Sequence, residues 1–146
     1  MRIYLDCCCF NRPYDDRIQE KIHLEGEAIL AIINRCKQNN DEIIGSPVLD
    51  LENNNICDIE KREKVKYFYN QTISKKIDYT ANIFERVKEL QKQTNVRTFD
   101  IFHLSFAEYS NVDILLTTDI KFEKSSAKIN LKTRVINPLK YLMEVI

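Results

Sequence analysis

The chain has 146 residues, of which 44% are hydrophobic and 30% are charged, as is typical of one globular domain with one core. Basic and acidic residues number 22 each, which argues against tight non-specific binding of nucleic acid, because that binding depends on excess positive charge. No apolar run is long enough to cross a bilayer, and the N-terminus lacks the features of a secretory signal. We therefore expect a single cytoplasmic domain, residues 1–146, with no membrane partner.

Cysteine and glycine usage narrows the class of protein further. The five cysteines are odd in number and form no CxxC pair, so reduced thiols are expected rather than disulfides or a zinc site. Cys7, Cys8 and Cys9 are consecutive, and we expect them to pack beneath a site rather than bind a metal, because tandem cysteines cannot all face one ion. Only two glycines occur, Gly26 and Gly45, which excludes glycine-rich phosphate loops.

The predicted elements alternate between short apolar strands and helices in which apolar residues recur at helical spacing. Ser46-Pro47 and Asn137-Pro138 each combine an N-cap residue with proline at the first helical position. In chain order we expect a strand at 3–5, a loop at 13–16, a helix at about 18–36, a strand at 43–44, a helix from 46–47, helices at about 59–69, 81–91 and 98–110, strands at 114–116 and 135–136, and a final helix from 137–138. This order predicts an α/β fold, a three-layer α/β/α sandwich with a central parallel sheet.

Four acidic residues stand out by their positions in these elements. Asp6 and Asp119 each follow a predicted strand, at the sheet edge where ligands bind in parallel sheets. Glu52 shares a helix face with apolar residues, whereas Asp50 lies about 200° away around the helix and is expected to be solvated. Asp100 falls in the first turn of its helix, where a negative charge suits the helix dipole.

Converging carboxylates favour a bound cation. One strand-terminal aspartate is often only a turn or capping residue, but several acids at one sheet edge are costly unless a cation or hydrogen bonds compensate them. All-oxygen ligation favours Mg²⁺ or Mn²⁺ over zinc, and such ions activate water and neutralise phosphate charge in phosphodiester cleavage. A Ser–His–Asp site is less favoured, because only His23 and His103 are present and no serine lies at a tight strand-to-helix elbow.

Four segments resemble the signature regions of PIN-domain nucleases, a family that includes the toxins of VapBC toxin–antitoxin pairs. In chain order they are IYLDCCCFNRP, SPVLDLE, FDIFHLSFAE and LLTTDIKF, and the likeness extends from Asp6 to about Phe122. Its most specific part is the D-x-x-H-L-S-x-A helix followed by LLTTD. The resemblance implies an α/β/α sandwich with a parallel sheet and cleavage of RNA that depends on Mg²⁺ or Mn²⁺.

Carried over residue by residue, the resemblance implies a catalytic and metal-binding set of Asp6, Glu52, Asp100 and Asp119. It also implies a polar hydroxyl near the site at Thr117. Two features depart from the family pattern. Asp100 is followed by Ile101-Phe102 rather than by small residues. Asp50 is a competing candidate, beside Glu52, for the acid on the helix.

Polar residues close to these acids in the sequence are candidates for holding RNA phosphates. They are Asn11, Arg12, Arg97 and Lys121, and the alternative for the basic ones is ordinary salt bridging to the same acids. His103 lies one turn after Asp100. We expect it either to hydrogen-bond a carboxylate of the site or to be a packed structural histidine.

The leading hypothesis is therefore a PIN-type endoribonuclease in which Asp6 and Asp100 hold the main Mg²⁺ or Mn²⁺. Glu52 and Asp119 would complete the coordination shell of this ion or bind a second ion. The family resemblance also implies a homodimer and, if the protein is a toxin, an antitoxin partner. The alternative is a PIN fold that binds RNA or protein without cutting. A phosphotransfer domain with Asp6 as nucleophile is least favoured, because Cys8 stands where that chemistry has a second acid.

Overall fold

The computed structural model describes all 146 residues and contains one five-stranded sheet in the order β3-β2-β1-β4-β5. Every neighbouring pair of strands is parallel, which confirms the predicted fold class. The strands are β1 (Arg2–Leu5), β2 (Glu42–Gly45), β3 (Lys75–Lys76), β4 (Ile114–Leu116) and β5 (Arg134–Ile136).

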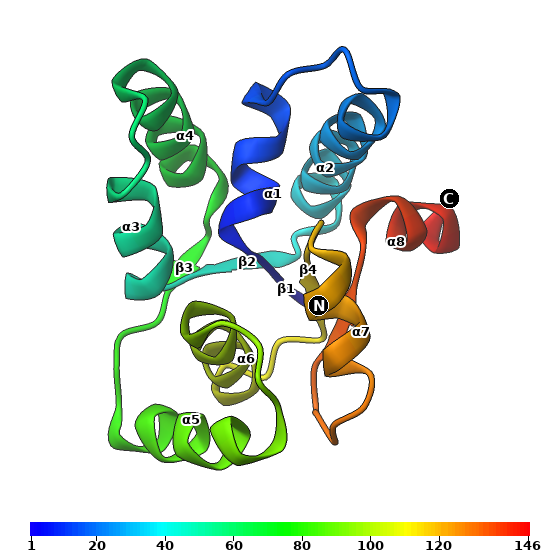
Figure 1. Cartoon of the computed structure of the whole chain (residues 1–146). Coiled ribbons are helices and arrows are strands. Elements are labelled where there is room, and N and C mark those ends of the chain that lie inside the picture. The colour runs from blue at the N-terminus through cyan, green and yellow to red at the C-terminus, as the bar shows by residue number, and fades with distance from the viewer.

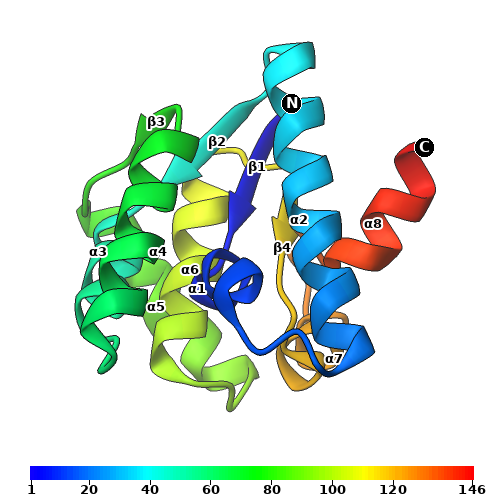
Figure 2. The same ribbon diagram turned by 90° about the horizontal axis from the view of Figure 1, so that it is seen from above.

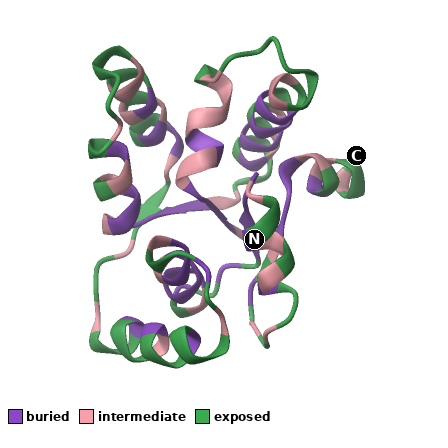
Figure 3. Cartoon of the chain, viewed as in Figure 1, coloured by how far each residue is buried: buried purple, intermediate pink, exposed green.

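Helices cover both faces of this sheet, with α1, α2 and α4 on one side and α5 and α6 on the other (Figure 1). The helices are α1 (Cys7–Asn11), α2 (Glu20–Asn39), α3 (Pro47–Asn54), α4 (Ile59–Thr72), α5 (Ala81–Gln93), α6 (Thr98–Tyr109), α7 (Ile120–Ser126) and α8 (Pro138–Val145), with a 3-10 turn at Arg12–Tyr14. Buried residues line the inward faces of these helices and most of the sheet (Figure 3). No helix is long and apolar enough to span a membrane.

Several elements differ from the sequence-based expectation. Strand β3 and helices α1 and α7 were not expected, and the 3-10 turn at Arg12–Tyr14 occupies part of the segment expected as a loop. Helix α2 begins at Glu20 rather than near residue 18, and Ile18 is 89% exposed, so it does not belong to the apolar face. The two lysines of β3 are both exposed, and the strand is defined by backbone bonds such as the one from Ile77 N to the carbonyl of Gly45, at 3.0 Å.

The register of β1 and β4 brings two distant segments together. Leu5 pairs with Leu116, and both are fully buried in a core of 30 residues. Because the two strands are parallel neighbours, the residues that follow them leave the sheet at the same edge. Figure 2 shows α1 and α7 at this end of the sheet. This edge carries the residues considered next.

Candidate active site

Asp6 and Asp119 lie at the carboxyl ends of β1 and β4, as the sequence indicated. Asp6 follows β1 directly, and its backbone N–H donates to the carbonyl of Leu116 at 3.2 Å. Both acids cap helices: Asp6 Oδ1 accepts from Cys9 N and Asp119 Oδ1 accepts from Phe122 N, each at 3.1 Å. Capping and a role in a site are compatible, because each carboxylate uses one oxygen for its backbone bond.

Asp6 is a buried carboxylate without a basic partner. It is 3% exposed, and no lysine or arginine forms an ion pair with it. Burial raises the pKa of the Asp6 carboxyl well above its usual value, an effect that Thr117 and His103 only partly oppose. A buried anion of this kind is costly alone, and a bound cation would offset that cost.

Glu52 belongs to a chain of buried hydrogen bonds. Its carboxylate bonds to Nε2 of His103, whose side chain is 1% exposed. Nδ1 of His103 lies 2.5 Å from the hydroxyl of Tyr4, which in turn lies 2.7 Å from Oγ of Ser46. Ser46 also caps α3, the helix that carries Glu52. His103 is thus both hydrogen-bonded to a carboxylate and buried in the interior.

Asp100 lies in the first turn of α6 with its side chain 4% exposed. Arg97 donates to both of its oxygens, from Nε and one terminal nitrogen, at 3.3 Å each. Burial raises the pKa of Asp100, and the Arg97 guanidinium opposes this rise. The hydrogen bonds and charge of Asp100 raise the pKa of Arg97, and the charges of Glu52 and Asp119 add to this rise. Three of the four acids thus share the surroundings of one guanidinium.

Asp6 joins this group through its neighbours. Glu52 and Asp6 both raise the pKa of the Tyr4 phenol, although burial is the larger cause. His103 lies within electrostatic range of both Asp6 and Asp100. The structure therefore gathers the four acids at one end of the sheet. Their oxygens do not form a tight ligand cluster of three or more groups within 4.8 Å.

The side chains that do approach so closely are Asp6, Cys8 and Cys9, whose ligand atoms all lie within 4.8 Å of one another. The sequence argument expected the tandem cysteines to pack beneath the site, because they could not all face one ion. Two of the three share a cluster with Asp6, whereas Cys7 does not. Hydrogen bonds with Cys9, to Asp6 and from Thr118 lower the pKa of the Cys8 thiol to about 6 despite burial. No sequence motif signalled this arrangement.

The residues expected to hold RNA phosphates differ in whether their side chains already have partners within the protein. Arg12 pairs with Asp15 at 3.1 Å and with Glu25 at 3.4 Å, and it donates to the Thr118 hydroxyl at 2.9 Å. Arg12 is thus paired within the protein, but with acids other than the four candidates, so the expected salt bridge to those acids is not formed. Asn11 donates to the carbonyl of Cys7 at 2.8 Å.

Lys121 is exposed in the first turn of α7 and forms no ion pair. Thr117 is 1% exposed, and its hydroxyl accepts from the backbone N–H of Asp119 at 3.1 Å. Lys121 is therefore freer to meet a phosphate than Arg12, and Thr117 orders the turn that carries Asp119.

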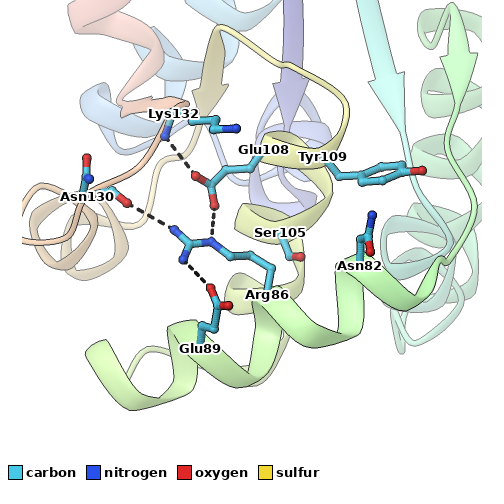
Figure 4. Close-up of a pocket in the computed structure, with 8 residues that line it drawn as sticks. All are labelled: Asn82, Arg86, Glu89, Ser105, Glu108, Tyr109, Asn130 and Lys132. Carbon is cyan, nitrogen blue, oxygen red and sulfur yellow. Dashed lines mark hydrogen bonds and ion pairs between the residues drawn. The ribbon is translucent and has the colours of Figure 1, made fainter.

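Two other features lie apart from these acids. Asp50 forms an ion pair with Lys76 of β3 and its side chain is 33% exposed, so it is half-buried and paired rather than solvated as expected. A cavity of about 440 Å³ lies between α5, α6 and the segment near Asn130 (Figure 4). Its residues include none of the four acids, and Arg86 is tied there to Glu108 and Glu89.

The sequence of this chain matches a known protein family over most of its length. The model of the PIN domain matches residues 3–128, which include all four acids. The chain belongs to the PIN domain family. A comparison with curated protein sequences gives no match.

Solved structures share the fold at low sequence identity. The crystal structure of VapBC2 from Rickettsia felis, bound to a DNA fragment from their promoter, matches with a TM-score of 0.62 and 17% identity, covering 94% of this chain and 98% of that one. FitAcB from Neisseria gonorrhoeae matches with a TM-score of 0.60 and 11% identity over the same shares. At these identities the likeness concerns the fold alone.

Proposed function

We propose that this PIN domain is a metal-dependent endoribonuclease whose site is formed by Asp6, Glu52, Asp100 and Asp119. The observation that carries the proposal is the gathering of four acids, from four separate segments, at the carboxyl edge of a parallel sheet. Only one of them, Asp100, has an arginine or lysine partner. Such a concentration of negative charge is maintained at a cost to stability, which a functional role for a cation explains.

The oxygen ligands of the four acids suit Mg²⁺ or Mn²⁺ better than other metal ions that nucleases use. The four carboxylates offer hard oxygen ligands, and Asp6 and Asp100 are buried with raised pKa values that a divalent ion would reverse. In this proposal Asp6 and Asp100 are the main ligands, and Glu52 and Asp119 complete the shell directly or through water. When bound, the metal supplies a Lewis acid for the phosphate and lowers the pKa of water.

Glu52 is the residue best placed to handle a proton. With a neutral imidazole, the buried chain has one consistent polarity: Ser46 donates to Tyr4, Tyr4 donates to Nδ1 of His103, and Nε2–H donates to Glu52. This fixes the orientation of the carboxylate. Its remaining lone pairs can accept a proton from a water molecule that attacks phosphorus.

Lys121 and Arg97 are proposed to hold the substrate. Arg97 is 68% exposed although it pairs with Asp100, so its guanidinium lies between solvent and the site. Lys121 is exposed next to Asp119. Two cations at the rim would attract the phosphates of RNA toward the acids.

The test is cleavage of a defined RNA by the purified full chain with Mn²⁺, with Mg²⁺ and with EDTA. We expect cleavage with either metal, none with EDTA, and a loss of at least a hundredfold in Asp6→Asn and Asp100→Asn. Glu85→Gln is the matched control, because Glu85 is an exposed acid of α5 with no hydrogen bond or ion pair. A wild type that binds RNA but never cuts it would favour the non-catalytic alternative.

An antitoxin partner and a homodimer belong to this proposal as well. They are supported by the family resemblance, and the antitoxin also by the VapBC2 neighbour, whose name denotes a two-component complex. Light scattering of the purified chain tests the dimer. Co-expression with the product of an adjoining gene, followed by co-purification, tests the antitoxin.

A further inference from the structure

Two adjacent thiols and a carboxylate meet at the start of α1. The Sγ atoms of Cys8 and Cys9 and an oxygen of Asp6 all lie within 4.8 Å of one another, and Cys8 Sγ is 2.7 Å from Asp6 Oδ1. The third tandem cysteine points elsewhere, since Cys7 Sγ contacts Asn11 at 3.2 Å and Asn53 at 3.6 Å. The cluster is therefore specific to two of the three thiols.

We infer that Asp6, Cys8 and Cys9 form a binding site for Zn²⁺, distinct in ligand chemistry from the all-oxygen site of the four acids. Zinc is bound in proteins by cysteine sulfur and carboxylate oxygen, usually in tetrahedral geometry. Mg²⁺ avoids sulfur ligands, and soft thiolates select zinc over magnesium and manganese. A purely oxygen-binding nuclease site has no need of two thiols beside its first aspartate.

The spacing of the cluster suits zinc. Zn–S bonds of about 2.3 Å and Zn–O bonds of about 2.1 Å in a tetrahedron place the ligand atoms roughly 3.5–3.8 Å apart. The three ligand atoms already lie within 4.8 Å of one another, which is close to these separations. Three protein ligands leave the fourth position to water, as in open zinc sites.

The surroundings also favour a dication here. Asp6 is buried and has no basic partner. Cys8 is half-buried, whereas Cys9 is fully buried. Thr118 N donates to Cys8 Sγ at 3.4 Å, a bond that orients the sulfur and is compatible with its acting as a thiolate ligand. Hydrogen bonds of this kind around a ligand orient it and tune its affinity.

The site predicts metal-specific inhibition of the nuclease. Because Asp6 belongs to both ligand sets, an ion held by the two cysteines withdraws Asp6 from the four acids. Zinc binds most protein sites more tightly than manganese does, so Zn²⁺ should inhibit at concentrations well below those of Mn²⁺ that support cleavage. This consequence rests on the proposed ribonuclease function, whereas the zinc site itself does not.

Direct binding is measured with Cd²⁺, whose thiolate complexes absorb in the ultraviolet, and with Zn²⁺ in competition. The full chain carries Cys57→Ser in all samples, because Cys57 is an exposed thiol outside the cluster. We expect one equivalent of Cd²⁺ to give a thiolate band, and we expect Cys8→Ser and Cys9→Ser each to weaken binding at least tenfold. Cys7→Ser is the matched control and should bind as tightly as the parent.

The outcomes distinguish the zinc site from the proposed nuclease function. No thiolate band, or equal weakening by Cys7→Ser, overturns the zinc site. If Cys9→Ser fails to fold, as its circular dichroism would show, Cys8→Ser alone decides, since its side chain is only half-buried. In the nuclease assay, Cys8→Ser should need at least ten times more Zn²⁺ for half inhibition. A chain that shows the band but cuts no RNA supports the zinc site and refutes the nuclease.

Discussion

The hydroxyl of Tyr4 lies 2.5 Å from Nδ1 of His103, although the two residues are 99 positions apart in the chain. Tyr4 is in the central strand β1 and His103 is in α6, so the bond joins the sheet to the helix that carries Asp100. Both side chains are at most 1% exposed. The bond sets which nitrogen of His103 faces Glu52, and it therefore couples the core to the site.

Replacing Tyr4 with phenylalanine tests this coupling. The change leaves Ser46 Oγ and His103 Nδ1 without their buried partner, which costs about 1–3 kcal/mol in the free energy of unfolding. We also expect RNA cleavage to fall about tenfold or more, since Glu52 loses its fixed orientation. Urea denaturation and the cleavage assay measure the two effects. Tyr67→Phe is the control, because Tyr67 is 69% exposed, and a Tyr4→Phe protein as stable and active as the control would refute the coupling.

The buried carboxyl of Asp6 should make stability depend on pH. Burial raises its pKa in the folded state, so the folded protein binds a proton there that the unfolded chain, with a pKa of about 4, has already lost. The stability that Asp6 contributes is thus complete below about pH 4 and is lost as pH rises through the folded pKa. Asp6→Asn keeps a side-chain oxygen to cap α1, and it should be more stable than the wild type at neutral pH in EDTA.

This gain should shrink toward zero as the pH falls to about 4, where both the folded and unfolded forms of the wild type are protonated. Denaturation in EDTA at several pH values measures it. Glu85→Gln, which changes an exposed acid of α5, should show no comparable dependence. An Asp6→Asn gain that is constant with pH would mean that charge burial is not its cause.

Much of the fold could be predicted because its elements carry local signals. Apolar runs mark β1 and β4, and the serine–proline and asparagine–proline pairs mark the starts of α3 and α8. Strand β3 has no such signal: it consists of two exposed lysines and exists only through backbone pairing with Ile44 and Gly45. Helix α1 has five residues, which is too short for a helical period to be read.

The positions of the candidate acids could be predicted as far as sheet geometry and helical phase extend. Both Asp6 and Asp119 follow adjacent parallel strands, and the helical phase distinguishes Glu52 from Asp50. The cluster of Asp6 with Cys8 and Cys9 depends on the conformation of α1, which the sequence did not reveal. The partners of Arg12 could not be predicted either, since Glu25 meets it only because α2 packs on the 3-10 turn.

Gly45 ends β2 at a position where the structure leaves no room for a side chain. An added Cβ would lie 2.5 Å from the Tyr69 hydroxyl oxygen and 3.0 Å from Cδ1 of Ile73. Tyr69 also accepts a hydrogen bond from Ser46 N at 3.2 Å, at the start of the helix that carries Glu52. We expect Gly45→Ala to cost about 1–3 kcal/mol in the free energy of unfolding, measured by urea denaturation.

Two comparisons show whether the clash is the cause. Gly26→Ala places its Cβ no closer than 3.4 Å to any atom, and in the interior of α2 it should stabilise by up to about 1 kcal/mol. Tyr69→Phe removes the hydroxyl that Gly45→Ala meets, so the double variant should lose less stability than the sum of the two single variants. Strict additivity would show that the strain lies elsewhere.

The last prediction concerns the metal of the proposed nuclease. An ion that binds only the folded protein stabilises it by mass action, about 2.7 kcal/mol at one hundred times its dissociation constant. Mn²⁺ should therefore raise the melting temperature of the wild type, and Mg²⁺ should do so less, because it gives up its water molecules reluctantly. Asp6→Asn and Asp100→Asn should each reduce the Mn²⁺ shift by more than half, since each removes a charged oxygen ligand.

Two acids outside the site serve as controls in these melts. Asp113 accepts from the backbone N–H of Arg2 at 2.9 Å, at the opposite edge of the sheet from Asp6, and Asp50 is paired with Lys76. Asp113→Asn and Asp50→Asn should keep the full Mn²⁺ shift. If they lose it as fully as the site variants do, the shift reflects general charge screening. If the wild type shows no shift at all, the four acids hold no ion, and the non-catalytic role becomes the better account of this PIN domain.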